Sequence, residues 1–417
     1  EKYQFSEKRD RAFFTRLVEG TLERQITIDY VADQFSKTKI RKCKPLIRAL
    51  LRMGIYQLLY MDQVPDSATC NEAVKLAKKR GFSRLSGFVN GVLRNISRKK
   101  ETISYPKKDK NFVTYLSVTY SIPEWIIKFF MKTYDDETVE KIIESYLEDK
   151  KTTLCCLMSK GGKDVIRKEL EEENVTVEDG ELIENAVKIS DYDFLYRLRA
   201  FREGKCYVQD ESSMLCAKLA GAKEGQFVMD LCSAPGGKSL YTADQMKGSG
   251  QVLSRDLTEY KTDLIEDNIE RMGFTNMEAE VFDATILDEE HIEAADVVIA
   301  DVPCSGLGIM GKKNDIKYHI SEDGMKDLVK LQREILTNAV QYVKHGGTLI
   351  YSTCTINPEE NEKNMQWIIN NFDYEAVDIT EELPKNLKIE TAKDGYIQLL
   401  PGVHSCDGFF IAKLRRK

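Results

Sequence analysis

The sequence predicts a multidomain protein, with an all-α domain over residues 1–125, a small α/β bridging domain over 126–208 and a doubly wound α/β domain over 209–417. Three observations support this division. Apolar residues recur at helical spacing through about the first hundred positions. Short alternating runs surround one helical pattern between Thr152 and Val208. After Gln209, strand patterns alternate with helical patterns, which is typical of a mainly parallel sheet.

The N-terminal domain is predicted from segments that each carry one broad apolar face. In "PLIRALLRMGIYQLLYM", residues 45–61, apolar side chains recur at helical spacing. The segments "NEAVKLAKKRG" and "RLSGFVNGVLRNISR" continue this pattern, and Gly81 ends the first of them as a helix C-terminus should. Because the chain begins inside a helical pattern, we expect the natural protein to have residues before Glu1.

The middle of the chain predicts two helices and then a small sheet. A polar stretch over 98–110 interrupts the helical pattern, and residues 121–150 predict two more helices, with Pro123 at an N1-like position. The runs "TTLCCLM", "VTVEDG", "AVKIS" and "KCYVQ" have strand character and surround the helical segment "GKDVIRKELEEEN". Cys155 and Cys156 in the first run are expected to pack within the sheet.

The C-terminal domain contains five predicted strands, and the first four end in an acid. The strand segments are "GQFVMDL", "GQVLSRD", "NMEAEVFD", "ADVVIAD" and "GGTLIYSTC". The acids are Asp230, Asp256, Asp283 and Asp301. Ligands of such sheets bind beyond the carboxyl ends of the strands, so these acids are expected to surround a ligand.

The loop "CSAPGGKS" after the first strand looks like the end of a phosphate-binding P-loop. A P-loop needs a glycine five positions before Gly237, and Cys232 stands there. A glycine turn into a helix still offers backbone N–H groups to an anion. Asp256, twenty residues after Gly236, can accept both ribose hydroxyls of an adenosine, and Asp283 is placed to meet the adenine edge. S-adenosylmethionine is therefore the expected ligand.

Two of the ten cysteines, Cys304 and Cys354, also lie at strand ends. Methylation of a pyrimidine at carbon 5 needs thiol and acid groups of this kind beside the methyl donor. A thiolate adds to carbon 6, an acid holds N3, and a base later removes the carbon-5 proton. The target base must be taken out of any stack. The cysteines show no CxxC or zinc spacing, so we expect free thiols in a reducing cytoplasm and no metal.

The composition, 42% hydrophobic and 31% charged, is that of a globular protein and excludes disorder. No window approaches the length of a membrane span, and the charged N-terminus lacks a signal-peptide core, so a cytoplasmic monomer is expected. The net charge of −7 argues against nucleic acid, yet residues 75–100 carry nine Lys/Arg and no acid. This basic segment is either a phosphate-binding face or a solvated helix surface.

Five motifs together resemble those of the RNA 5-methylcytosine methyltransferases: "DLCSAPGGKS", "DVPCSGLG", "KKNDIKYHI", "YSTCTINPEENE" and "PGVHSCDGFF". Within that group the chain is similar to the bacterial Sun/Fmu family. The segments "RMGIYQLLYMDQVP", "NEAVKLAKK" and "FVNGVLRN" resemble the antitermination factor NusB. The resemblance covers nearly the whole chain. It implies a NusB-like N-terminal domain, a Rossmann-like methyltransferase domain and a cytosine in 16S ribosomal RNA as substrate.

The resemblance also assigns roles to residues. Cys354 would be the nucleophile, Cys304 the thiol that assists product release, and Asp301 a contact of the cytosine ring. S-adenosylmethionine would be held by Cys232, Ser233, Ala234, Pro235, Gly236, Gly237, Lys238, Asp256, Asp283 and Asp301. The sequence departs from the family at Arg255, where a small or apolar residue is usual, and at "TTLCCLMSK", which replaces an Arg–x–Asn element. Arg255 is expected to alter how Asp256 is held.

For RNA contacts we predict Lys312, Lys313 and Lys317 near the active-site loop, and Arg80, Arg84 and Arg94 in the basic segment. Asp315 is expected to order its loop. Ordinary surface positions are the alternative for these basic residues. Two other functions stay open: methylation of transfer RNA, since the catalytic motifs do not separate RNA substrates, and a non-catalytic RNA-binding assembly factor that works through its helical domain.

Overall fold

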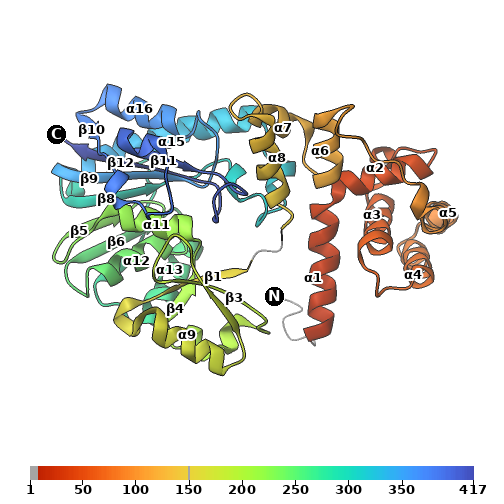
Figure 1. The fold of residues 1–417 in the computed structure, drawn as a ribbon, viewed down its shortest axis with the longest axis horizontal. Helices are drawn as coiled ribbons and strands as arrows, with labels where there is room; N and C mark the ends of the chain where they lie inside the picture. Colours follow the sequence, from red (N-terminus) through yellow and green to blue (C-terminus); the bar gives the residue numbers. More distant parts are fainter. Residues whose placement is uncertain (1–7, 149–150) are drawn as a thin grey trace. The chain divides into compact units, whose positions relative to one another are not determined.

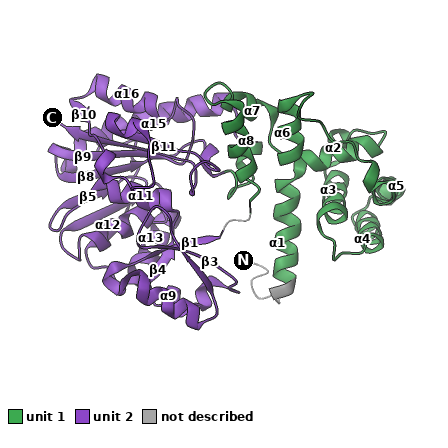
Figure 2. Cartoon of the chain, in the orientation of Figure 1, with its two compact units in different colours: residues 1–148, 310–319 green, residues 149–309, 320–417 purple. Residues whose placement is uncertain are grey.

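The computed structural model describes residues 8–148 and 151–417, which form two compact units (Figure 2). The first unit extends to Glu148 and includes Met310–His319; the second contains the rest of the chain. The boundary predicted at residue 125 therefore falls inside the first unit. It lies within helix α7 (Glu124–Phe130). This helix and α8 (Asp136–Ser145) bury Ile126, Phe130 and Ile142 completely, and both contact α6 (Phe112–Tyr120).

The first unit is all-α, as the helical patterns predict. Its helices are α1 (Lys8–Glu23), α2 (Gln25–Phe35), α3 (Pro45–Tyr60), α4 (Asp66–Lys79), α5 (Ser86–Arg98), α6 (Phe112–Tyr120), α7 (Glu124–Phe130) and α8 (Asp136–Ser145), with α14 (Ile316–His319) from the later segment. The core includes the fully buried Ile55 and Leu93. A Cβ at Gly54 would lie 2.8 Å from the Leu93 side chain, so this glycine allows α3 and α5 to approach closely.

Two details of this unit differ from the sequence patterns. Helix α6 has a mixed aromatic and β-branched composition that no helical period reveals. Its start is fixed by Asn111, whose side chain accepts a hydrogen bond from Thr114 N at 3.0 Å. Pro123 is the N-cap of α7 and not its first helical residue.

The second unit begins with a four-stranded antiparallel sheet in the order β2-β3-β1-β4. The strands are β1 (Thr152–Cys156), β2 (Thr176–Asp179), β3 (Ala186–Ser190) and β4 (Cys206–Val208), accompanied by α9 (Gly162–Glu172) and α10 (Arg199–Arg202). Cys155 and Cys156 are both fully buried, as expected for sheet packing. Cys156 belongs to the core under α9, whereas Cys155 packs with Met214 and Leu215 of the following domain. We call this element the bridging sheet.

The remainder of the unit is built on a larger sheet in the order β10-β12-β9-β8-β5-β6-β7, with β11 also paired to β12. Its strands are β5 (Phe227–Asp230), β6 (Gln251–Asp256), β7 (Met277–Val281), β8 (Ala295–Asp301), β9 (Val343–Thr353), β10 (Tyr374–Ala376), β11 (Tyr396–Leu399) and β12 (Phe409–Arg416). The five strands from β9 to β7 are parallel, and β12 runs antiparallel to β9.

Helices cover both faces of this sheet, so the doubly wound prediction is confirmed (Figure 1). On one face lie α11 (Glu211–Ala220), α12 (Gly237–Gln245) and α13 (Glu259–Met272), which pack on residues such as Val252 and Ile299. On the other lie α15 (Glu322–Tyr342) and α16 (Glu362–Asn371), which pack on residues such as Val298. Strand order reverses between β5 and β8, and ligands bind at such a switch point. None of the described helices combines the length and apolarity needed to cross a membrane.

Candidate active site

The two strand-end cysteines meet at the carboxyl ends of β8 and β9, on one side of this switch point. Cys304 follows β8 and Cys354 follows β9, and the register that pairs Asp301 with Ser352 brings both loops out side by side. Their Sγ atoms lie 3.0 Å apart. The pKa of Cys304 is raised well above its usual value, first by the hydrogen bond with Cys354 and then by burial. One thiol therefore acts as a hydrogen-bond donor to the other.

Backbone and hydroxyl contacts fix the two cysteine loops against each other. The residues immediately after the cysteines, Ser305 and Thr355, share a hydrogen bond of 2.7 Å between their hydroxyls. Gly308 N donates to Cys354 O at 3.1 Å, and Gly408 N donates to Gly308 O at 3.0 Å. Three segments that are distant in the sequence thus hold the thiol pair.

Asp301 lies at the end of β8, close to the thiols. One carboxylate oxygen accepts a hydrogen bond from Lys238 Nζ, and the other accepts one from Ser352 Oγ at 2.9 Å. Burial alone lowers the pKa of Lys238, but the charge of Asp301 raises it, and the net direction is upward. Lys238, predicted to bind the cofactor, is therefore a charged partner that orients Asp301.

The loop after β5 is organised by hydrogen bonds to its own backbone. Gly236 has a left-handed φ of +99° and caps α12, and its N–H donates to Ser233 O at 2.7 Å. Asp256 accepts from Ala234 N at 2.9 Å and from Leu257 N and Lys261 Nζ at 2.8 Å each. Asp256, which is predicted to bind the ribose hydroxyls, thus also holds the glycine loop in place.

Asp230, at the end of β5, is fully buried. Its Oδ2 accepts from Ser239 Oγ at 2.7 Å, whereas its Oδ1 has no hydrogen-bond partner among the described residues. Burial raises the pKa of Asp230 to about 6. An orphaned buried acceptor is costly, so this oxygen fits a ligand that carries hydrogen-bond donors.

Two other residues singled out in the sequence, Asp283 and Arg255, form side-chain hydrogen bonds with partners outside this cluster. Asp283 accepts from both Thr285 N (2.9 Å) and Thr285 Oγ1 (2.7 Å), which lowers its pKa and makes it the first residue of a turn. Arg255 points away from Asp256 because successive strand residues face opposite sides. It donates to Glu280 at 2.7 Å and to Asp288 at 2.6 Å, so the expected effect on Asp256 does not arise through direct contact.

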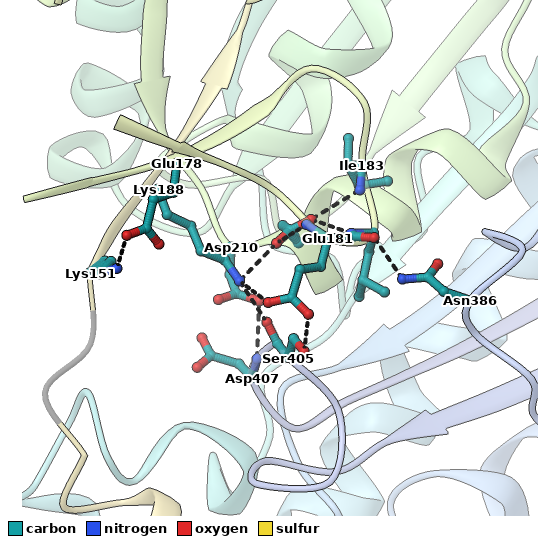
Figure 3. Close-up of polar contacts among 11 residues, drawn as sticks. Lys151, Glu178, Glu181, Ile183, Lys188, Asp210, Asn386, Ser405 and Asp407 are labelled. Carbon is teal, nitrogen blue, oxygen red and sulfur yellow. Dashed lines mark hydrogen bonds and ion pairs between the residues drawn. The ribbon is translucent and has the colours of Figure 1, made fainter. Parts of the chain in front are cut away.

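The closing motif "HSCDGFF" is anchored to the bridging sheet (Figure 3). Lys188 Nζ, from β3, donates to Glu181 at 3.0 Å and to Ser405 O at 3.4 Å, and Ser405 Oγ donates to Glu181 at 2.5 Å. Asp407 N donates to Asp210 at 3.1 Å. Because Gly408 follows directly and contacts Gly308, the bridging sheet helps to position the cysteine loops.

The residues predicted to contact RNA differ in exposure. Arg80, Arg84 and Arg94 are exposed around the α4–α5 turn and on α5, and Lys312 and Lys313 are also exposed. Lys317 is only 2% exposed.

The burial of Lys317 argues against the RNA contact predicted for it. Its Nζ donates to Glu23 O at 2.8 Å, at the C-terminal end of α1, where a cation is favoured. Burial lowers the pKa of this lysine to about 8. A basic residue in the sequence does not reveal whether its charge is exposed.

Sequence reasoning missed Glu360, which is fully buried and accepts a hydrogen bond from Ser305 N at 2.8 Å. It also missed Gln332, which donates to Pro303 O at 2.9 Å. Glu360 stands within the quoted motif "NPEENE", so the signal was present, but no pattern in the sequence links Gln332 to it.

Comparison with known proteins identifies the family. The family described as 16S rRNA methyltransferase RsmB/F matches residues 217–415, and the NusB family matches residues 1–98. A probable ribosomal RNA small subunit methyltransferase B of Bacillus subtilis is 37% identical, covering 98% of this chain and 91% of that protein. A protein of the same name from Synechocystis is 30% identical over the same shares.

Solved structures agree in fold. The crystal structure of PH0851 has a TM-score of 0.84 at 28% identity, covering 100% of this chain and 92% of that chain. NSun6 from Pyrococcus horikoshii, solved with SFG, has a TM-score of 0.63 at 20% identity, covering 70% of this chain and 98% of that chain. With its NusB-like helical domain and its Rossmann-like domain carrying the paired thiols, the chain belongs to the RsmB/F family of 16S rRNA methyltransferases.

Proposed function

We propose that this chain methylates carbon 5 of a cytosine in 16S ribosomal RNA through a covalent adduct with Cys354. The observation that carries the proposal is the 3.0 Å separation of the Cys354 and Cys304 Sγ atoms beside Asp301. Carbon 5 of cytosine is a poor nucleophile until a thiolate adds to carbon 6. A site that holds one thiol against another, near the partly buried ion pair of Lys238 and Asp301, matches that requirement.

Each of the three residues at the thiol pair is proposed to have its own role in the reaction. Cys354 Sγ forms a bond to carbon 6, and a proton at N3 neutralises the negative charge that develops there; Asp301 is proposed to contact the ring at N3 and to hold this proton. After the methyl group has been accepted by carbon 5, a base takes the carbon-5 proton, and the bond between Sγ and carbon 6 breaks with its electrons returning to sulfur. Cys304 is proposed to assist this release, since its S–H group lies within hydrogen-bond distance of Cys354 Sγ.

S-adenosylmethionine would supply the methyl group as an electrophilic sulfonium. The end of β5 and the helix after it fit its charged amino-acid end: the buried Asp230 Oδ1, which has no partner among the described residues, is an acceptor for an ammonium, and the N-terminus of α12 favours a carboxylate. Asp256 is proposed to accept the ribose hydroxyls, and Asp283 to lie near the adenine. Residues 232–238 would form the rest of the cradle.

The alternatives differ in substrate and in chemistry. The curated relatives that cover 98% of this chain are named for small-subunit ribosomal RNA, which supports that substrate over transfer RNA. A non-catalytic assembly factor would not need both a thiol pair and a carboxylate oriented by hydrogen bonds. We therefore favour an enzyme.

The test is a trapping experiment with small-subunit ribosomal RNA that carries 5-fluorocytidine. Fluorine cannot leave as a proton does, so we expect the adduct to accumulate in the presence of S-adenosylmethionine and to survive denaturation. Peptide mapping should locate it at Cys354. Unsubstituted RNA is the control and should give little adduct.

The other outcomes are informative. An adduct with transfer RNA, but none with ribosomal RNA, would keep the chemistry and change the substrate. No adduct with either RNA, in a protein that still binds both RNA and cofactor, would favour the non-catalytic assembly factor.

A second prediction concerns the exposed arginines of the basic segment. The double variant Arg80→Ala/Arg84→Ala is expected to weaken RNA binding about ten-fold and to reduce the slope of log K against log salt by about 2, because each arginine would neutralise one phosphate. Fluorescence anisotropy at several salt concentrations measures both. Lys141→Ala, which removes a lysine already paired with Glu137, is the control; equal losses in both proteins would contradict the assignment.

A further inference from the structure

Glu360 is a carboxylate with no exposed surface, packed against the loop that carries Cys304. Its Oε2 accepts from Ser305 N at 2.8 Å and from Gln332 Nε2 at 2.9 Å, and its Oε1 accepts from Asn357 Nδ2 at 2.8 Å. All three donors are neutral groups. Burying a carboxylate on neutral donors alone is unfavourable, so its charge calls for a functional explanation.

The carboxylate acts on the backbone on both sides of Cys304. Ser305 N belongs to the peptide that follows Cys304, and Gln332, bound to the same carboxylate, also donates to Pro303 O at 2.9 Å. The backbone that carries the thiol is thereby held in place. The negative charge also lies close to Cys304, because it is hydrogen-bonded to the adjoining peptide.

The corresponding network behind Cys354 is neutral. Asn361 Oδ1 accepts from Thr353 Oγ1 at 2.6 Å, and Asn361 Nδ2 donates to Thr355 O at 3.0 Å. An amide therefore supports the residues on both sides of Cys354, where a carboxylate supports those of Cys304. The two thiols, although only 3.0 Å apart, differ in the charge behind them.

We propose that Glu360 is the positioning residue that differentiates the two thiols: its carboxylate keeps Cys304 as a neutral S–H donor and leaves Cys354 to become the thiolate. The inference rests on the proposed function, in which Cys354 is the nucleophile. A negative charge disfavours a second negative charge nearby, and a donated hydrogen bond stabilises a thiolate.

Other charged and titratable groups near the pair do not remove this difference. Asp301 and Lys238 form an ion pair and largely cancel each other. Tyr351 donates to Glu360 O and stays neutral, since burial raises its pKa well above the usual value. The pKa of Cys304 is raised in turn by its hydrogen bond with Cys354, by burial, and by the charge of Cys354 and of Glu360.

The direct test is the pH dependence of Cys304 alkylation by iodoacetamide, followed by peptide mapping, in the Cys354→Ala protein with and without Glu360→Gln. Removing the neighbouring thiol from both proteins isolates the effect of Glu360. We expect Glu360→Gln to lower the midpoint by about one pH unit, so that Cys304 reacts about ten-fold faster below the midpoint. Equal midpoints in the two proteins would overturn the inference.

Two controls separate charge from packing. Gln332→Leu removes a neutral donor and leaves the carboxylate, so it should not lower the Cys304 midpoint; a drop equal to that of Glu360→Gln would overturn the inference. Glu359→Gln removes a neighbouring carboxylate whose side chain is 58% exposed, and it should change nothing. In otherwise native protein, Glu360→Gln is expected to lower kcat about ten-fold without changing KM for S-adenosylmethionine.

If Glu360→Gln does not fold, the order in which the two cysteines of the unmodified protein are alkylated provides an independent test. Cys354 should be alkylated before Cys304 at pH 8, and the reverse order would overturn the inference. The thiol titration does not require RNA. If the fluorocytidine adduct fails to form while Glu360→Gln still lowers the Cys304 midpoint, the proposed function fails and the role of Glu360 stands.

Discussion

Replacing Cys354 with alanine is expected to abolish methyl transfer while binding of S-adenosylmethionine survives. The thiol supplies the bond to carbon 6, and without it carbon 5 cannot attack, so the rate should fall by a factor on the order of 10³ or more. Cofactor binding should persist because the glycine loop is fixed by hydrogen bonds to Asp256 and to its own backbone, in which Cys354 takes no part. Single-turnover transfer of a labelled methyl group, together with calorimetry, measures both.

Two further variants make this result specific. Cys43→Ala removes a free cysteine of the helical unit and should retain full activity. Cys304→Ala leaves the nucleophile in place and should accumulate the covalent protein–RNA species. Full activity in Cys354→Ala would refute the thiol mechanism.

Replacing Gly308 with alanine is expected to have the second largest effect. The new Cβ would lie 2.0 Å from Gly408 O and 2.5 Å from Gly408 C, which are backbone atoms and cannot rotate away. This steric clash can be relieved only if the Cys304 loop and the closing motif move apart. Overpacking of this kind costs about 1–3 kcal/mol, and displaced thiols should lower the methyl transfer rate on the order of 10².

Thermal unfolding and single-turnover kinetics measure these two losses. The matched control is Gly91→Ala, since a Cβ on that residue of α5 would meet nothing within 4 Å. It should leave activity unchanged and stabilise the helix by about 0.5–1 kcal/mol. If Gly308→Ala keeps both its melting temperature and its rate, the two loops do not depend on this glycine contact.

The sequence predicts the fold well where apolar residues recur with a single period, either that of a helix or that of a strand. The parallel strands follow from apolar runs that alternate with helical patterns, and α3 and α5 follow from their continuous apolar faces. Helix α6 was missed because its aromatic and β-branched residues suit a strand equally well. The predicted boundary at residue 125 and the compact unit that ends at Glu148 differ because the sequence does not show that α7 and α8 pack against α6.

The candidate site shows the same division between local and non-local information. The strand-end position of Cys304 and Cys354 follows from local pattern, but their 3.0 Å separation depends on the register of β8 and β9 and on two glycines a hundred residues apart. The pairing of Lys238 with Asp301 and the burial of Lys317 are likewise tertiary facts. A sequence shows where a lysine occurs, but not which group its ammonium contacts in the folded protein.

The membership of Met310–His319 in the first unit has a consequence for dissecting this protein. The chain passes from one unit to the other three times, so no single cut yields two intact fragments. A fragment that stops at residue 148 loses the hydrogen bonds that Lys317 and Tyr318 donate to Glu23 O and Leu22 O at the end of α1. The excised helical fragment would lack part of its native packing. A difference in RNA affinity between fragments would then partly reflect this loss of structure.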